Sequence, residues 1–270
     1  MTHHDCDICI IGGGSAGLSL AAGAAQMGAK ILLFEAGAMG GDCLNSGCVP
    51  SKALLAAAKA AHHAKGAPHM GIMGTPPQID FAAVKAHVTA VIDGIAPHDS
   101  IERFAAFGVT VISEHAAFTG PREVASKHHK VRAKYVVIAS GSQPAMPPID
   151  GLSDIDFYTN ETIFADPAKP DHLVIVGGGT IGIEMAQAHA RLGVNVTVIE
   201  ALSIMARDDS ELVAMLKTQL ESDGVTFIEG VKVASVRQNQ PNVMTLTLAH
   251  GAVIKASHLL VATGRQPVID

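Results

Sequence analysis

Residues 173–200 read LVIVGGGTIGIEMAQAHARLGVNVTVIE, and residues 8–35 read ICIIGGGSAGLSLAAGAAQMGAKILLFE. Each stretch predicts an apolar strand, a G-x-G-x-x-G turn, a helix, a second apolar strand and a final glutamate. The last glycine precedes that glutamate by 18 positions in both copies (17 to 35 and 182 to 200). The chain therefore contains the same strand–turn–helix–strand unit twice.

This spacing is typical of a phosphate-binding turn. The first glycine makes the tight turn, the second lets the backbone approach a pyrophosphate, and the third lets helix and strand pack closely. The helix N-terminus attracts the phosphates, and the glutamate accepts hydrogen bonds from a ribose diol. One such motif is weak evidence, but two matched copies predict an α/β protein with two Rossmann-like domains built on parallel sheets. The motif residues predicted to bind two dinucleotides are Gly12, Gly14, Ser15, Ala16, Gly17 and Glu35 in the first copy and Gly177, Gly179, Thr180, Ile181, Gly182 and Glu200 in the second.

The glutamate of the second copy also bears on which dinucleotide binds. A 2′-phosphate on the ribose is normally bound by arginine. The first basic residue after Glu200 is Arg207, and it is followed by two aspartates. The sequence therefore favours NAD(H) over NADP(H) in the second site.

Composition excludes other classes of protein. The net charge is −6, the pI is about 6.1 and aromatic residues make up 4% of the 270 residues, which argues against a nucleic-acid partner. Residues 8–29 carry no charge, but their glycines and polar residues favour a strand, turn and helix over a membrane span. We expect a soluble, cytoplasmic protein with no membrane partner.

The remaining segments fill out two domains. The Pro-rich stretch at 142–151 predicts the boundary between a first domain, 1–149, and a second domain, 150–270. Helices are predicted over 50–66, over two stretches of 80–108 broken near Pro97, and over 209–224. Strands are predicted over 109–120, 129–141, 225–236, 243–249 and 257–263.

Two of the four cysteines, Cys43 and Cys48, lie in GGDCLNSGCVPSK, residues 40–52. A metal site needs more protein ligands than two cysteines, and Asp42 alone does not complete the set. No metal is therefore predicted. A structural disulfide that closes so short a loop would stabilise the folded protein by only about 2 kcal/mol. Two interpretations of the pair remain open: inert thiols and a redox-active disulfide. A helix start and nearby Lys52 favour the redox pair, since both lower a thiol pKa.

At these residues the chain resembles the class I pyridine nucleotide-disulfide oxidoreductases, a family that includes dihydrolipoamide dehydrogenase, glutathione reductase and mercuric reductase. GGDCLNSGCVPSK resembles the active-site signature of that family. The two glycine motifs resemble its FAD and NAD(P) sites in the same order. VVIASGSQP and LLVATGRQP resemble two further family segments, the first of which touches the flavin.

The resemblance implies a role for individual residues. Cys48 would exchange electrons with the flavin, and Cys43 would attack a substrate disulfide. Lys52 would lie near the flavin and pair with Glu184. The first glycine motif would hold FAD and the second the nicotinamide dinucleotide. Further residues implied at the FAD site are Gly41, Asp42, Lys52, Ala116, Ser140, Gly141 and Ser142, and at the nicotinamide site Val233, Gly264 and Arg265.

The implied activity is that of a flavin-dependent enzyme similar to dihydrolipoamide dehydrogenase, which moves electrons between NAD(H), FAD and a dithiol/disulfide substrate. A mercuric reductase-like enzyme is the alternative, and a nucleotide-binding fragment without disulfide turnover is another. The catalytic histidine of the family belongs to a C-terminal dimerisation domain, which is expected to be absent because the sequence ends at Asp270. We therefore expect a homodimer for a full-length form and a monomer for this chain.

Overall fold

The computed structural model describes residues 1–67 and 70–269; residue 270, the last of the predicted second domain, lies outside this range. The chain divides into two compact units, which are described separately. Unit 1 comprises residues 1–50, 90–143 and 267–270. Unit 2 comprises residues 51–89 and 144–266.

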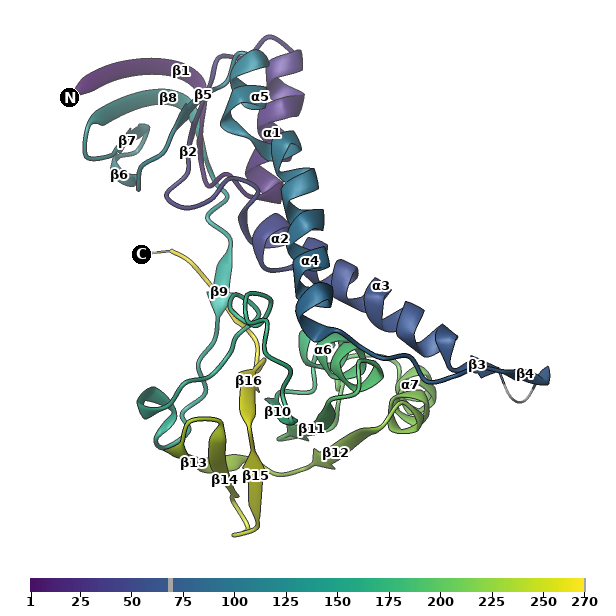
Figure 1. The fold of residues 1–270 in the computed structure, drawn as a ribbon. Helices are drawn as coiled ribbons and strands as arrows, with labels where there is room; N and C mark the ends of the chain where they lie inside the picture. The colour runs from purple at the N-terminus through teal and green to yellow at the C-terminus, as the bar shows by residue number, and fades with distance from the viewer. Residues whose placement is uncertain (68–69, 270) are drawn as a thin grey trace. The chain divides into compact units, whose positions relative to one another are not determined.

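Unit 1 is built on one six-stranded sheet in the order β5-β2-β1-β8-β7-β6 (Figure 1). Four strands are parallel, and the last two join the edge as an antiparallel hairpin. The bounds are β1 Thr2–Ile11, β2 Ile31–Phe34, β5 Thr110–Ile112, β6 Ala117–Gly120, β7 Glu123–Ala125 and β8 His129–Ile138. The crossover from β1 to β2 is α1, Ser15–Gln26, so the first glycine motif forms the predicted strand–turn–helix–strand unit.

Helical segments follow the first crossover. They are α2 Gly41–Asn45, α3 Cys48–Ala64, α4 Phe81–Ile95, the 3₁₀ turn η2 Ala96–Asp99 and α5 Ile101–Ala106. Between α3 and α4 lie two short antiparallel strands, β3 Gly66–Ala67 and β4 Ile72–Met73. The predicted helix at 50–66 and the break near Pro97 are confirmed, because Pro97 lies in the 3₁₀ turn and Ser100 caps α5 by accepting from the Arg103 N–H.

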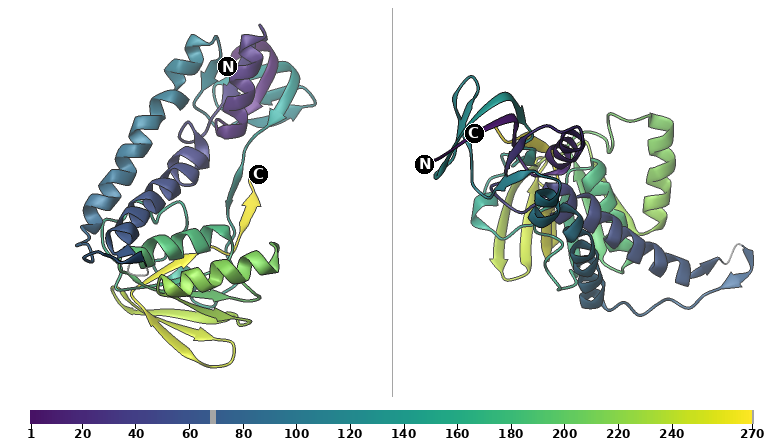
Figure 2. Two further views of the ribbon diagram at one scale, coloured as in Figure 1. Left: turned by 90° about the vertical axis from the view of Figure 1, so that its right-hand side faces the viewer. Right: turned by 90° about the horizontal axis from the view of Figure 1, so that it is seen from above.

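Unit 2 carries a four-stranded parallel sheet in the order β12-β11-β10-β16. The bounds are β10 His172–Val176, β11 Asn195–Glu200, β12 Val225–Glu229 and β16 His258–Val261. Helices α6, Thr180–Arg191, and α7, Ser210–Ser222, pack beside these strands, and an antiparallel meander lies on the opposite side (Figure 2). That meander is β13 Val233–Gln240, β14 Val243–Leu248 and β15 Val253–Ala256.

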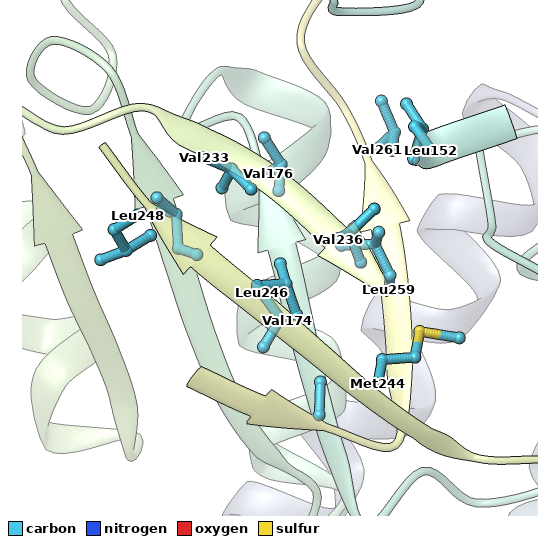
Figure 3. Packing of buried hydrophobic residues seen from close by; sticks show 12 residues of the cluster. Leu152, Val174, Val176, Val233, Val236, Met244, Leu246, Leu248, Leu259 and Val261 are labelled. Atoms are coloured by element: carbon cyan, nitrogen blue, oxygen red, sulfur yellow. The ribbon is translucent and has the colours of Figure 1, made fainter. Parts of the chain in front are cut away.

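The core of unit 2 lies between the parallel sheet and the meander (Figure 3). Alternate residues of β10 contribute Val174 and Val176, and β14 contributes Met244, Leu246 and Leu248. All are at most 7% exposed, because a period of two residues sends one face of each strand toward the other sheet. The α/β fold class with two Rossmann-like halves is thus confirmed.

Several predicted strands are wrong in extent. The strand predicted over 225–236 is two strands on different sheets, β12 and β13, separated by the turn at Gly230, whose φ is +72°. The strand predicted over 109–120 is also two strands, β5 and β6, but both belong to the same six-stranded sheet. Short elements were not predicted at all, because segments of three or four residues show too little periodicity: they are β7, β9 Ser142–Pro144, the 3₁₀ turn η3 Leu152–Asp154, β15 and β17 Arg265–Pro267.

Candidate functional site

The two glycine turns have nearly identical geometry. Gly12 and Gly177 have φ values of +113° and +114°, and a Cβ at either would lie within 2.3 Å of a carbonyl oxygen. At the third motif position, a Cβ on Gly17 would lie 1.9 Å from the Gly12 oxygen, and one on Gly182 would lie 2.0 Å from the Gly177 oxygen. The first and third glycines are therefore required by the fold itself.

The middle glycine of each motif is different. A Cβ on Gly14 would meet only the Gly41 Cα, at an ordinary 3.7 Å, and a Cβ on Gly179 would meet nothing within 4 Å among the described residues. Their φ values of −83° and −79° suit any residue. Each is also the N-cap of its helix, so it offers no side chain to the first-turn N–H groups. Folding does not demand glycine here, whereas a glycine at the middle position of such a motif is what allows a pyrophosphate to approach the backbone.

The glutamate after each second strand bridges the turn. Glu35 accepts from Gly13 N–H at 2.5 Å and from Gly37 N–H at 2.6 Å. Glu200 accepts from Gly178 N–H at 2.7 Å and from Leu202 N–H at 3.0 Å. Each carboxylate keeps lone pairs for a further donor such as a ribose hydroxyl.

A cavity of about 500 Å³ lies in unit 1 at the carboxyl ends of its parallel strands. That size matches a small-molecule or cofactor pocket. The predicted residues that line it are Gly12, Gly14, Glu35, Gly41, Asp42, Ala116, Ser140, Gly141 and Ser142. The predicted Ser15, Ala16 and Gly17 are not among its lining residues, and Lys52 belongs to unit 2.

A second cavity, of about 610 Å³, lies in unit 2. The predicted residues that line it are Gly177, Gly179, Thr180, Glu200, Val233 and Gly264, whereas Ile181, Gly182 and Arg265 do not. Arg265 instead donates to the Asn160 side-chain oxygen at 3.1 Å. Arg207, singled out in the sequence, and Lys232, which was not, both line this cavity.

The cysteine pair lies in unit 1. Cys43 is in the short helix α2, and Cys48 is the first residue of α3; both are free thiols, Cys43 half-buried and Cys48 exposed. A side-chain hydrogen bond to Cys48, followed by burial, raises the pKa of the Cys43 thiol above its ordinary value. The pKa of Cys43 is therefore shifted in the direction opposite to the predicted lowering, because its S–H donates to the Cys48 sulfur and this favours the protonated thiol.

The other two cysteines differ from this pair in burial. Cys6 and Cys9 are buried in β1, and burial raises their thiol pKa values to about 11 and about 12. Thiols held protonated in this way are poor nucleophiles near neutral pH. Among the described cysteines, thiol chemistry therefore points to Cys43 and Cys48.

The predicted ion pair between Lys52 and Glu184 is present. The Lys52 Nζ lies 2.5 Å from the Glu184 Oε1, joining α3 to α6 within unit 2. The lysine side chain is 62% exposed, so the pair is accessible to a ligand and contributes little to stability.

Sequence reasoning missed the residue that anchors the loop after Glu200. Glu229, at the end of β12, accepts from the Ile204 N–H at 2.8 Å and pairs with Lys217 of α7. The Lys217 ammonium lowers the pKa of Glu229 and keeps it ionised. A lone glutamate at a strand end gives no sequence signal for this role.

Two features are absent from residues 1–67 and 70–269. No helix there is long and apolar enough to cross a membrane. No group of three or more His, Cys, Asp or Glu side chains within the same ranges could hold a metal ion.

The fold and the two cavities define a protein with two dinucleotide-type pockets and an accessible thiol pair. The family model described as pyridine nucleotide-disulphide oxidoreductase matches residues 6–270, so the chain belongs to that family.

Curated relatives carry two different names. A mercuric reductase of Streptomyces lividans is 36% identical over 99% of this chain and 58% of its own length. A dihydrolipoyl dehydrogenase of Thermus scotoductus is 33% identical over 97% of this chain and 57% of its own. The chain thus spans little more than half the length of these relatives.

A solved structure supports the same placement. The Cu(II) complex of the HOCl-induced flavoprotein disulfide reductase RclA from Escherichia coli matches with a TM-score of 0.85 and 28% identity. The match covers 98% of this chain and 57% of that one.

Proposed function

We propose that this chain is the dinucleotide-binding part of a flavin-dependent oxidoreductase similar to dihydrolipoamide dehydrogenase. It would pass electrons between NAD(H), FAD and the Cys43–Cys48 pair, and from there to a dithiol or disulfide substrate. The observation that carries the proposal is the pair of middle glycines, Gly14 and Gly179, which the fold does not require and a bound pyrophosphate does.

The first cavity is assigned to FAD and the second to NAD(H). When bound, these cofactors supply hydride and electron transfer. The free N–H groups at the start of α1 and α6 would hold the pyrophosphates. Glu35 and Glu200 would accept from the adenosine riboses, and Ala116 and Val233 would lie beside the two dinucleotides, since each lines the corresponding cavity. We retain 1–149 and 150–270 as the proposed functional domains.

NAD(H) is proposed over NADP(H) for the second cavity. The Glu200 carboxylate would repel a 2′-phosphate, and its two backbone hydrogen bonds hold it at the glycine turn. Arg207 and Lys232 line the same cavity, so the preference depends on how far their positive charge offsets Glu200.

The thiol pair would change between a dithiol and a disulfide, releasing or taking up two electrons and two protons. With a disulfide substrate, Cys43, whose thiol pKa is raised by its hydrogen bond to Cys48, would lose its proton and attack one substrate sulfur, releasing the other as a thiolate that takes up a proton. Cys48 would then attack the Cys43 sulfur, which closes the Cys43–Cys48 disulfide and releases the second substrate thiol. Lys52, neutralised in part by Glu184, would supply a cation near the reacting groups.

A second candidate is a mercuric reductase-like activity, in which the two thiols would bind a mercuric ion. It is favoured by the 36% identity to the Streptomyces lividans enzyme, by the exposure of Cys48 and by the partial exposure of Cys43. Soft thiolate ligands suit such an ion. The proposed full-length form is a homodimer in either case.

Anaerobic titration tests the proposal. FAD-saturated protein is titrated with NADH while flavin absorbance and free thiols are followed. We expect flavin bleaching, and two more free thiols than in an oxidised sample. A Cys48→Ser variant should still bleach but lose the thiol gain. Bleaching without any change in thiol number in the unmodified protein would refute the redox role of the pair. Adding lipoamide or mercuric ion to the reduced sample and measuring reoxidation distinguishes the two candidates.

A further inference from the structure

Unit 2 contains a third, small cavity, which shares no lining residue with the two larger cavities. Its volume is about 10 Å³, enough for the centre of one water molecule. Lys85 of α4 and His189 of α6 line it, together with Tyr158 and Asp166 from the segment before β10 and His258 of β16. These polar side chains surround a space otherwise walled by apolar residues.

His189 lines this cavity, and its ring has an acceptor without a partner among the described residues. The side chain is 1% exposed, and its Nδ1 lies 2.8 Å from the Met185 carbonyl oxygen. A carbonyl only accepts, so the Nδ1 carries the hydrogen, and the Nε2 of the neutral ring is left as an acceptor. Burial lowers the pKa of His189 to about 4, which keeps the ring neutral near pH 7. Within the described residues, its Nε2 has no hydrogen-bond partner.

Lys85 presents unused donors. The residue is 5% exposed, and its Nζ donates to the Ile163 carbonyl at 2.5 Å. An ammonium has three N–H groups, so further donors remain. Burial lowers the pKa of Lys85 to about 8, while Asp166 opposes that shift. The Phe81 ring lies near both groups: its centroid is 5.3 Å from the Lys85 Nζ and 5.9 Å from the His189 ring centroid.

Tyr158 and Asp166 provide the acceptor side. The Tyr158 hydroxyl donates to the Asp166 Oδ2, and the Asp166 Oδ1 accepts from the Ala168 N–H at 2.7 Å. The stacked ring of His258 lies 5.8 Å from the Tyr158 ring, and its Nδ1 lies 2.8 Å from the Ser257 hydroxyl. Carboxylate and phenol oxygens retain lone pairs for one more donor.

We propose that this cavity binds one internal water molecule, which donates to the His189 Nε2 and accepts from the Lys85 ammonium. Its second hydrogen is directed to the Tyr158–Asp166 pair. A buried water of this kind makes about three hydrogen bonds to groups that would otherwise lack partners. The water joins α4, α6 and the segment before β10, so it fixes the contact between α4 and the helix that carries Glu184.

Two measurements on the unmodified protein test this site. A crystal structure at about 1.2 Å resolution or better should show an ordered water between the Lys85 Nζ and the His189 Nε2. Nitrogen-15 NMR at pH 7 should show the Nδ1–H tautomer of His189, with an Nε2 shift typical of a hydrogen-bonded acceptor. An empty cavity, a direct Lys85–His189 bond or an Nε2–H tautomer would each overturn the proposal.

Substitution adds a matched comparison. Lys85→Met removes the ammonium and should move the His189 Nε2 resonance toward an unbonded acceptor, with loss of the water. Lys59→Met on the exposed face of α3 is the control and should leave both unchanged. An unchanged resonance in a folded Lys85→Met protein would contradict a water bridge between Lys85 and His189. If that variant does not fold, the crystal structure and the His189 tautomer of the unmodified protein test the proposal.

Discussion

Helices α1 and α6 follow the same glycine turn but have different surroundings. Two residues after the last glycine of the motif, α1 carries Ser19 and α6 carries Glu184. Seven residues after it, α1 carries Ala24 and α6 carries His189. The buried residues of α1 are Gly17, Leu18 and Ala21, whereas α6 buries Gly182, Ile183, Met185, Ala186, Ala188, His189 and Ala190.

The difference has a physical cause in residues 51–89, which belong to unit 2. Lys52 of α3 pairs with Glu184, and Phe81 of α4 packs on His189. His62 of α3 also lies 3.5 Å from the buried Asp223 at the end of α7. The two copies thus share the same glycine turn, and at α6 the helices α3 and α4 add charged and aromatic contacts to it. The residues that the two copies share form the backbone turn. The residues that differ, such as Glu184 and His189, make contacts that are specific to the second copy.

The third glycines should be equally indispensable in both copies. Gly17→Ala and Gly182→Ala each place a Cβ about 2 Å from a carbonyl oxygen, so helix and strand must separate. We expect a loss of about 3 kcal/mol or more in the free energy of unfolding, or no folded protein. Thermal and urea unfolding of each variant measure this. Gly23→Ala, where a Cβ meets nothing within 4 Å, is the control and should be neutral or stabilising.

Acid should destabilise the second copy through a residue that the first copy lacks. Burial lowers the pKa of His189 from 6.5 in the unfolded chain to about 4 in the folded protein. Between these values the unfolded chain binds a proton that the folded protein does not, so the free energy of unfolding is unaffected above pH 6.5 and falls as the pH is lowered toward 4. The loss is about 3 kcal/mol. Urea unfolding at steps between pH 7 and pH 4 should show this slope, and His189→Gln should reduce it. An equal slope in the variant would contradict the assignment.

The bridging glutamates should have the smallest effects. Glu35→Gln and Glu200→Gln each keep one acceptor oxygen and lose the charge, so each should weaken binding of its own dinucleotide by about tenfold. Calorimetric titration with FAD and NADH measures both constants. Glu200→Gln should also narrow the preference for NADH over NADPH, whereas Glu35→Gln should leave it unchanged. A larger effect of Glu35→Gln on that preference would reverse the assignment of the two sites.

Much of this arrangement could be predicted from the sequence. Glycine spacing and apolar runs predicted both strand–turn–helix–strand units, since these depend on local backbone requirements. The family resemblance predicted the Lys52–Glu184 pair, which lies 132 positions apart and has no local signal. Nine of the residues predicted for the first pocket line its cavity.

Other features depend on tertiary contacts that no local pattern encodes. The grouping of residues 51–89 with unit 2, the anchoring of Ile204 by Glu229 and the burial of Lys85 and His189 arise from packing between distant segments. The raised pKa of Cys43 depends on the position of one neighbouring sulfur. Lysine and histidine are usually exposed, so the sequence alone gave no reason to place this pair in a core.

The central claim is that the chain has two separate dinucleotide sites. The most direct test is to measure the affinities for both FAD and NADH in each of the two middle-glycine variants. Gly14→Ala and Gly179→Ala should fold with unfolding free energies within about 0.5 kcal/mol of the original, because neither Cβ meets the protein closely. Calorimetry should show that Gly14→Ala weakens FAD on the order of 100-fold and spares NADH, and that Gly179→Ala does the reverse. Unchanged affinity for both dinucleotides in both folded variants would contradict the account.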